Sequence, residues 1–391
     1  MIAREIAAEM RILLGEYPIV TLLGPRQAGK TTLAKSICHG ADYANLEVPE
    51  TREFAHSDPK AFLAQFSGQV VIDEIQRVPS LLSYIQDIVD SEKRNGRFVL
   101  TGSHQLELRG AVSQSLAGRT ALLNLLPFSI SELANAGVVF DRFEDYAFRG
   151  FLPRIYDPGL RPTVAWSNYY QTYVERDVRQ LIDLKNTSLF EKFIKLLAGR
   201  TGQLIDYSSL ANDVGVDSKS VRSWLSILEA SFLVFKLQPY FENFGKRVVK
   251  NPKYYFTDVG LLCFLLGIRE PEQVTRDPLV GGIFENLVIM EFLKERWNQG
   301  HIADFYFFRD SNENEVDLLV MEGRNILAME IKSCSTFSTG LLKGIFRIKK
   351  LMDNAFLKTF LIYNGKPFER SDGISALHFR DAAQNILRPS L

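Results

Sequence analysis

A glycine-rich segment with a lysine and a threonine at fixed positions carries the clearest chemical signal in this chain. Residues 18–33 read PIVTLLGPRQAGKTTL, with the spacing G-x-x-x-x-G-K-T. Backbone N–H groups of such a loop surround phosphate oxygens, the lysine reaches the terminal phosphates, and the threonine hydroxyl ligates Mg²⁺. The helix expected to start at the lysine adds the positive end of its dipole. The predicted phosphate-binding residues are Gly24, Pro25, Arg26, Gln27, Ala28, Gly29, Lys30, Thr31 and Thr32.

Two adjacent acids end a short aliphatic run further along the chain. Residues 70–76 read VVIDEIQ, the pattern of a buried parallel strand whose C-terminal tip carries carboxylates. Downstream of a phosphate-binding loop, Asp73 would hold Mg²⁺ through water, and Glu74 could polarise the attacking water. Acids at a strand end are common by themselves, but after this loop they favour a nucleotide hydrolase.

Hydroxyl groups end a second apolar run, RFVLTGS, at residues 97–103. Thr101 or Ser103 could bond the γ-phosphate or the lytic water, and a plain serine-glycine turn is an equal alternative. An additional strand between the loop-bearing strand and the acidic strand indicates the glutamate-bearing ATPase type. The GTPase type is disfavoured because no N-K-x-D-like guanine reader is visible.

An arginine follows in the segment SLAGRT, residues 115–120. Arg119 could act as a finger on the γ-phosphate of a neighbouring subunit, where its delocalised charge would stabilise the transition state. That role implies a homo-oligomer. The alternative is an ordinary solvated arginine on the surface.

The elements that must position these residues belong to a chain of 391 residues, long enough for two or three domains. We predict boundaries at 1–135, 136–250 and 251–391. Lys plus Arg and Asp plus Glu both number 46, so any basic surface must be local. The three cysteines form no C-x-x-C pair, which favours a reducing cytoplasm.

Membrane attachment is not expected. Residues 1–14 predict an amphipathic helix and not a signal peptide, because charged residues interrupt the apolar positions. The longest uncharged apolar run elsewhere, around residues 260–268, is too short to cross a bilayer. We therefore expect a cytoplasmic protein.

The middle of the chain predicts a helix-turn-helix. Residues 207–230, YSSLANDVGVDSKSVRSWLSILEA, place an apolar seam on two helices with Gly215 at the turn. A winged helix is the expected fold. Contact with DNA and packing against protein are equal alternatives for its role. The candidate DNA-binding residues are Lys219, Arg222, Lys246, Arg247 and Lys250, with Lys253 beside them. Upstream, the aromatic-rich connection between residues 127–133 and 149–153 is expected to act as a lid or hinge.

Acids recur in the last third of the chain. We expect an amphipathic helix over 282–294 carrying Glu285, strands over 305–309 and 315–321 with Asp317 in the second, and a strand over 328–332. Glu330 and Lys332 share one face of that last strand. Two carboxylates on a divalent metal, with a lysine that orients water, could hydrolyse a phosphodiester. The alternative is a structural relic with surface acids and a salt-bridged lysine.

The ordered segments GPRQAGKTTL, VVIDEIQ, LTGSHQ, SLAGRT, RGFLP, YVERDV, KYYFTDVGLLCFLLG, GGIFENLV, NEVDLLV and AMEIKS closely resemble a large group of bacterial and archaeal AAA-type ATPases. In that group a P-loop domain precedes a winged helix and a C-terminal domain of unassigned function. The resemblance spans nearly the whole chain. It implies ATP as the nucleotide, supports the roles given to the loop and the two acids, and strengthens the finger role of Arg119. The bulky Arg26 could touch nucleotide or a neighbouring subunit.

The resemblance also implies a fold class. It is an α/β protein with a P-loop NTPase three-layer parallel sheet, then a helical winged-helix domain, then an α/β restriction-endonuclease-like domain. The leading hypothesis is a Mg²⁺-dependent ATPase whose hydrolysis moves the winged-helix and nuclease-like domains on DNA. The alternative is a nucleotide-gated protein-interaction switch with an inactive nuclease-like domain.

Overall fold

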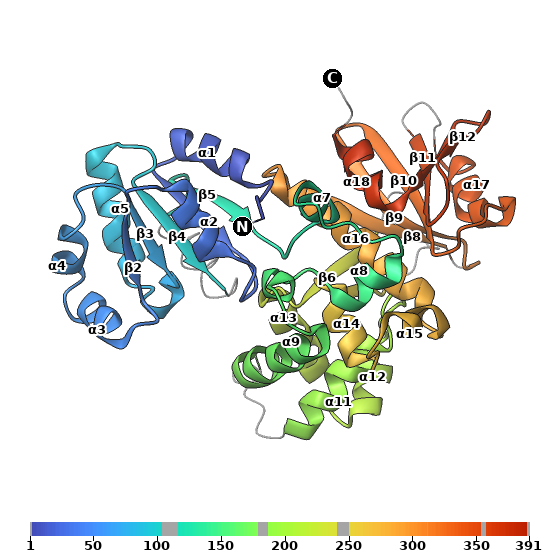
Figure 1. Ribbon diagram of the computed structural model, residues 1–391, viewed down its shortest axis with the longest axis horizontal. Coiled ribbons are helices and arrows are strands. Elements are labelled where there is room, and N and C mark those ends of the chain that lie inside the picture. Colours follow the sequence, from blue (N-terminus) through green and yellow to red (C-terminus); the bar gives the residue numbers. More distant parts are fainter. Residues whose placement is uncertain are drawn as a thin grey trace. The chain divides into compact units, whose positions relative to one another are not determined.

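The chain divides into two compact units. The computed structural model describes residues 2–103, 116–178, 187–240, 250–310, 312–352 and 357–388, and Figure 1 labels its elements. The first unit comprises Met1–Phe128, Ala230–Leu233 and Trp297–His301, and the second comprises Ser129–Glu229, Val234–Arg296 and Ile302–Leu391. Across the described ranges, no helix has both the length and the hydropathy that a membrane span requires.

A parallel sheet forms the middle of the first unit. Among the described residues its strands are β1 (Ile19–Leu23), β2 (Asp42–Asn45), β3 (Val70–Asp73), β4 (Phe98–Gly102) and β5 (Thr120–Asn124), in the order β2-β3-β4-β1-β5. β4 lies between β1 and β3, which confirms the expected strand between the loop-bearing strand and the acidic strand. Because these strands are parallel, β1, β3 and β4 all end at one edge of the sheet.

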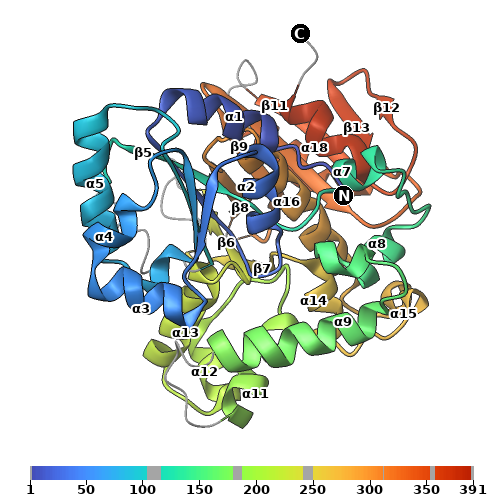
Figure 2. The ribbon, with the colours of Figure 1, turned by 60° about the vertical axis from the view of Figure 1, so that its left-hand side comes forward.

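Helices cover both faces of this sheet. They are α1 (Ala7–Glu16), α2 (Lys30–Ile37), α3 (Pro49–Ser57), α4 (Pro59–Ala64) and α5 (Leu81–Glu92), with the short 3-10 turn η1 (Ile75–Arg77). α1 and α2 pack against alternate strand residues, including Val20, Val71 and Val99, in one apolar cluster. α5 lies across the sheet from α2 (Figure 2). This part of the chain is therefore the three-layer α/β domain that the sequence predicts.

Short helices open the second unit. They are α7 (Ile130–Asn135), α8 (Phe143–Arg149), η2 (Pro153–Tyr156), α9 (Pro162–Tyr169), the π-helix η3 (Tyr170–Val178), α11 (Thr187–Ala198), α12 (Tyr207–Val214), α13 (Ser218–Ala230), α14 (Val259–Leu265) and α15 (Pro271–Arg276). The backbone N–H of Phe151 donates to the buried Asp258 carboxylate at 2.9 Å. A Cβ on Gly150 would clash with that carboxylate and with the Trp166 ring. The connection expected to act as a lid or hinge is thus packed firmly against α9 and α14.

The predicted helix-turn-helix is present. Gly215 ends α12 in the left-handed conformation with φ 94°, and α13 begins three residues later. The apolar seam is buried, as expected: Leu210, Ala211, Val214, Val221, Trp224, Leu225 and Leu228. An antiparallel pair follows, formed by β6 (Val234–Pro239) and β7 (Lys253–Phe256).

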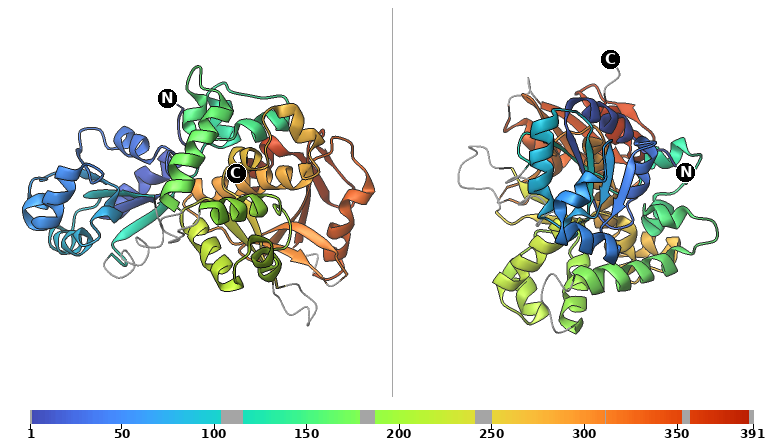
Figure 3. Two further views of the ribbon diagram at one scale, coloured as in Figure 1. Left: turned by 90° about the horizontal axis from the view of Figure 1, so that it is seen from below. Right: turned by 90° about the vertical axis from the view of Figure 1, so that its left-hand side faces the viewer.

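A mixed sheet fills the rest of the second unit. Among the described residues it adds β8 (Phe305–Arg309), β9 (Glu315–Glu322), β10 (Asn325–Lys332), β11 (Leu357–Tyr363), β12 (Phe368–Glu369) and β13 (Ile374–His378), in the order β12-β13-β11-β10-β9-β8-β6-β7. β8, β9 and β10 form an antiparallel meander, and β11 runs parallel to β10. The accompanying helices are α16 (Val280–Asn298), η4 (Thr339–Leu342), α17 (Lys343–Lys349) and α18 (Phe379–Leu387). Figure 3 shows α16 and these strands in orange and red.

The expected amphipathic character of the helix over 282–294 is wrong. From Ile283 to Arg296 every side chain of α16 except Glu285 is buried. Its charged residues are paired inside the unit: Lys294 Nζ lies 2.7 Å from Glu291 Oε1, and Glu291 Oε2 accepts the Ile130 N–H at 2.7 Å. Ion pairing inside the core therefore replaces the solvent-facing stripe that the charged residues suggested.

The predicted boundary near residue 250 falls between two strands of one sheet. β6 pairs with β7 and, at Gln238 and Pro239, with β8. The helix-turn-helix and the mixed sheet consequently belong to one compact unit. The division into three domains stays a prediction.

Candidate functional site

The glycine-rich loop connects the end of β1 to the start of α2. A Cβ on Gly24 would lie far inside van der Waals contact of the Leu125 carbonyl oxygen, so this position tolerates only glycine. Gly29 caps α2 in the left-handed conformation with φ 92°, which glycine adopts without strain. The loop therefore turns tightly against the backbone of Leu125, the residue that follows β5.

Lys30 is held inside this loop. Its side chain is 6% exposed, and Nζ donates to the carbonyl oxygens of Gly24 and Pro25 at 2.9 Å each. Burial lowers the pKa of Lys30, against the opposing effect of Glu74 and Asp73. A phosphate group is a stronger acceptor for this ammonium than two carbonyl oxygens. The loop thus holds the Lys30 ammonium group at the place where terminal phosphates would be bound.

Asp73, at the end of β3, collects three hydroxyl groups. Its Oδ2 accepts from Thr31 Oγ1 at 2.8 Å and from the Tyr43 hydroxyl at 2.9 Å, and its Oδ1 accepts from Thr101 Oγ1. Burial and the bond to Asp73 raise the pKa of Tyr43. Tyr43 escaped the sequence reasoning because it comes from β2, whose pairing with β3 no local pattern reveals.

Glu74 is held in an unusual backbone conformation. Its φ is 57° and ψ 48°, a left-handed conformation that costs free energy for a residue with a side chain. Its Oε2 accepts a hydrogen bond from Ser103 Oγ at 3.0 Å. Gln76 Nε2 donates to the same carboxylate and also to Ser103 Oγ, the latter at 3.1 Å. Gln76 Oε1 is a buried acceptor with no hydrogen-bond partner among the described residues. A water molecule at this place would satisfy it.

These residues fit a magnesium nucleotide. A carboxylate and a hydroxyl in contact, Asp73 and Thr31, are the oxygen ligands that Mg²⁺ takes. The tight approach at Gly24 and the buried ammonium of Lys30 suit a phosphate chain. Glu74 lies one residue beyond Asp73 and accepts a hydrogen bond from Ser103, the residue that follows β4. Arg26 points elsewhere, to Glu47 at 3.2 Å.

Arg4 also supports the loop, a role that no sequence pattern indicates. Its Nη1 donates to the Ala28 carbonyl oxygen at 2.7 Å, and its Nη2 to that of Leu126 at 2.6 Å. The guanidinium lies 5.0 Å from the centre of the Phe128 ring. One arginine near the start of the chain thereby ties the loop to the segment that follows β5.

Arg119 lies away from the loop of its own chain. It precedes β5, and Thr120 pairs with Ile19 at the start of β1, whereas the loop follows the end of β1. The five residues of β5 separate the two ends by roughly 16 Å. Arg119 forms an ion pair with Asp90 on α5, at 2.6 Å.

The candidate basic residues differ in position. Lys219, Arg222 and Lys250 are exposed, and the Arg222 guanidinium lies 3.9 Å from the centre of the Tyr207 ring. Lys246 and Arg247 lie outside the described residues. The inclusion of Lys253 in a basic surface patch is wrong, because its side chain is only 1% exposed and is ion-paired with acids.

The acidic residues of the last third do come together, at one edge of the mixed sheet. This follows from the meander, which places the start of β9 beside the ends of β8 and β10. Lys332 Nζ lies 2.7 Å from Asp317 Oδ2 and 2.7 Å from Glu330 Oε2. Burial and the neighbouring Asp317 raise the pKa of Glu330, and the Lys332 ammonium opposes this effect.

A set of three carboxylates at metal-ligand spacing is made by Glu285, Glu315 and Asp317, whose oxygens lie within 4.8 Å of one another. It does not include Glu330. Glu315 was missed, although it precedes Asp317 by two residues on the same strand and the period of two could have revealed it. Lys253 and Tyr255 were not predicted as partners of Glu285. They reach it from β7, and no local pattern shows that β7 lies beside α16.

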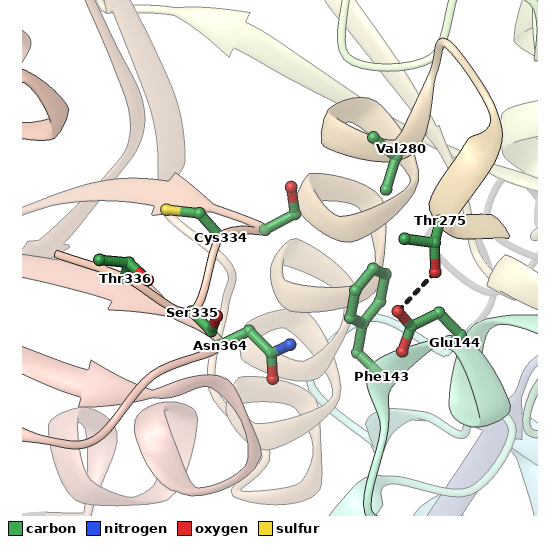
Figure 4. A pocket seen from close by; sticks show the side chains of 9 residues that line it. Phe143, Glu144, Thr275, Val280, Cys334, Ser335, Thr336 and Asn364 are labelled. Carbon is green, nitrogen blue, oxygen red and sulfur yellow. Dashed lines mark hydrogen bonds between the residues drawn. The ribbon is translucent and has the colours of Figure 1, made fainter.

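A pocket of about 380 Å³ opens beyond the same edge of the sheet (Figure 4). Residues after β10 and β11 line it from one side, among them Cys334, Ser335 and Asn364. α8 lines the other side, where Glu144 accepts the Thr275 hydroxyl at 2.7 Å. Polar side chains and the apolar Phe143 and Val280 share the lining, which contains neither lysine nor arginine among the described residues.

Three domain families match successive parts of the chain. Residues 16–134 match an AAA domain, and residues 140–272 and 280–381 match two domains of unknown function, DUF8612 and DUF4143. With the sheet order, the loop and the paired acids, this defines the first part of the chain as an AAA-type P-loop ATPase domain.

The chain belongs to the family of the uncharacterized protein Rv2008c of Mycobacterium tuberculosis. The two are 31% identical over 380 residues, which cover 96% of this chain and 83% of that protein. An uncharacterized protein of Haemophilus influenzae is 26% identical over 328 residues, covering 80% of this chain and 76% of its own length.

Two solved structures show some similarity to this chain. The Walker-type ATPase PABY2304 of Pyrococcus abyssi has 15% identity and a TM-score of 0.40, over 68% of this chain and 96% of its own. A RuvB variant of Thermotoga maritima has 18% identity and a TM-score of 0.30, over 59% and 88%.

Proposed function

We propose that this protein is a Mg²⁺-dependent ATP hydrolase. The observation that carries the proposal is the hydrogen-bonded set at the ends of β3 and β4, where Asp73 holds the Thr31 hydroxyl and Ser103 holds Glu74. This is the constellation that phosphoryl transfer to water needs: a metal ligand set and a positioned carboxylate beside it.

Each residue has a definite task in this proposal. The loop backbone and Lys30 bind the phosphates, and Thr31 and Asp73 would hold Mg²⁺, which supplies charge neutralisation when bound. Glu74 orients a water molecule and accepts its proton. Ser103 orients the Glu74 carboxylate through its hydroxyl group.

ATP hydrolysis by the purified full chain tests this proposal. We expect turnover that requires Mg²⁺, stops with a chelator, and falls to background in Lys30→Ala, because that change removes the ammonium from the phosphate site. Turnover in Lys30→Ala equal to that of the wild type would refute the assignment.

The Arg119 finger is part of the proposal only as a contribution to a second copy. Arg119 lies at the opposite edge of the sheet from the loop of its own chain, which supports action on the nucleotide of a second copy. The Asp90 ion pair is exposed, and such pairs contribute little free energy, so it does not prevent Arg119 from changing partner. A homo-oligomer is therefore the expected working form.

We further propose that ATP turnover acts on DNA through the second unit. Two observations support a winged helix there: the buried seam between α12 and α13, and the hairpin of β6 and β7 directly after it. Lys219 and Arg222 lie on the exposed face of α13, where a recognition helix presents cations to phosphates.

Salt-dependent binding of double-stranded DNA checks this part. We expect Lys219→Gln with Arg222→Gln to weaken binding and to reduce the slope of log affinity against log salt by about 2, one unit for each lost phosphate contact. Lys60→Gln, an exposed lysine on α4, is the matched control and should leave the slope unchanged. An unaltered slope in the double variant would rule out α13 as the DNA-binding helix.

The last third has features of a restriction-endonuclease-like domain. α16, the meander of β8 to β10, α17 and the parallel β11 follow one another in that order. Asp317, Glu330 and Lys332 are in contact, as nuclease chemistry would require. A second candidate function, a nucleotide-gated protein-interaction switch with an inactive nuclease-like domain, is favoured by the presence of Lys253 among the acids.

A further inference from the structure

A buried ammonium group lies where a nuclease-like domain would hold its metal. Glu285 from α16 and Glu315 and Asp317 from β9 bring carboxylate oxygens within 4.8 Å of one another. Lys253, the first residue of β7, places Nζ 3.0 Å from Glu285 Oε1 and in contact with Glu315 Oε1. Its side chain is 1% exposed, so it is a fixed internal cation and not a surface lysine.

The backbone around Lys253 holds the ammonium in this position. Lys253 pairs with Leu237 of β6 on one side and forms a bridge with Leu204 on the other. Two residues further on, the Tyr255 hydroxyl donates to the same oxygen of Glu285. Nζ also lies 5.4 Å from the centre of the Phe307 ring. The strand pairing thus fixes the backbone of Lys253, and its ammonium is held by two carboxylates beside the Phe307 ring.

Every carboxylate of the set already has a cationic partner. Glu285 faces Lys253, Glu315 is also bound by Arg309 Nη1 at 2.8 Å, and Asp317 is bound by Lys332 Nζ at 2.7 Å. A divalent ion entering this set would meet a fixed ammonium at close range in a buried environment, where repulsion between like charges is strong. The residues present do not fit a metal ion while Lys253 remains.

We propose that Glu285, Glu315 and Asp317 form a cation site whose resident cation is the ammonium group of Lys253, so that the folded chain binds no divalent metal there. The inference rests on the proposed nuclease-like character of the last third. According to this inference, the site holds no metal ion while the Lys253 ammonium is present. A metal ion can bind only after the ammonium is removed.

Binding of Mn²⁺, followed by its electron paramagnetic resonance signal, tests the proposal. All proteins carry Asp73→Asn and contain no nucleotide, which removes the other candidate Mn²⁺ site. We expect Lys253→Met to bind one Mn²⁺ at least about tenfold more tightly than the parent chain. Adding Glu315→Gln to Lys253→Met should abolish the gained site, and Lys250→Met, at an exposed lysine of the same segment, should gain none.

Two results would overturn the proposal. One is a folded Lys253→Met that gains no Mn²⁺ binding, with folding judged by circular dichroism. The other is an Mn²⁺ site in the parent chain that disappears with Glu315→Gln, and this arm needs no Lys253 variant, so it decides the matter even if Lys253→Met does not fold.

A stability measurement gives the second readout. Loss of the buried cation removes the cationic partner of Glu285, so Lys253→Met should melt at a lower temperature than the parent. Mn²⁺ should raise the melting temperature of that variant alone. ATP turnover of the chain with Asp73 intact is measured separately. Its absence would refute the proposed ATPase and leave the Mn²⁺ result valid.

Discussion

Replacing Glu74 by glutamine should lower ATP turnover by about 10²- to 10⁴-fold while ATP binding persists. Glutamine keeps the size of the side chain and a hydrogen bond with Ser103, but it cannot accept a proton from water. Single-turnover hydrolysis and equilibrium binding of ATP, measured on one preparation, separate the two effects.

The matched control for this change is Glu53→Gln. Glu53 is an exposed acid on α3 in the same unit, so its replacement should leave both turnover and binding at the parent values. If Glu74→Gln hydrolysed ATP at the rate of Glu53→Gln, Glu74 could not be the residue that activates water.

Replacing Gly24 by alanine should remove ATP binding and lower the free energy of unfolding by about 1–3 kcal/mol. The added methyl group would overlap the carbonyl oxygen of Leu125, which is backbone and cannot rotate away. The loop would have to lift from β5, and Lys30 would lose its carbonyl partner on Gly24. Chemical denaturation and ATP titration of one variant measure both consequences.

Gly15→Ala provides the comparison for Gly24→Ala. Gly15 lies in α1 with no atom within 4 Å of an added Cβ, and alanine is favoured over glycine inside a helix. It should therefore be neutral or stabilising, with ATP binding unchanged. Equal stability of the two alanine variants would show that the approach of Gly24 to β5 does not constrain the loop.

The parts of the fold that depend on short sequence separation were predictable. The loop, its helix and the acidic strand are contiguous patterns, and the helix-turn-helix follows from an apolar seam with a glycine between its halves. The place of β4 between β1 and β3 was also correct, and this expected strand was the reason for favouring the glutamate-bearing type of ATPase.

The errors arose where distant segments meet. Glu291 and Lys294 look like the polar face of an amphipathic helix, yet they neutralise each other inside the core. Lys253 looks like one more cation of a basic run, but strand pairing carries it to acids on α16 and β9. The presence of a charged residue in the sequence does not reveal whether its side chain contacts water or a distant carboxylate. The order of the strands in the sheet determines this.

The partners of the nucleotide site illustrate the same limit. Asp73 was predictable from its position after an aliphatic strand, whereas Tyr43 reaches it from a strand with no distinctive pattern. Arg4 braces the loop through backbone carbonyl oxygens, which leave no trace in residue types. The sequence thus predicted the residues proposed to do chemistry better than those that hold them in place.

The most direct test of the central claim is steady-state ATP hydrolysis by the full chain with Mg²⁺, with and without double-stranded DNA. We predict Mg²⁺-dependent turnover well above that of Lys30→Ala, and a higher rate when DNA is present. Turnover no greater than that of Lys30→Ala under both conditions would contradict the claim that this chain is an ATPase acting on DNA.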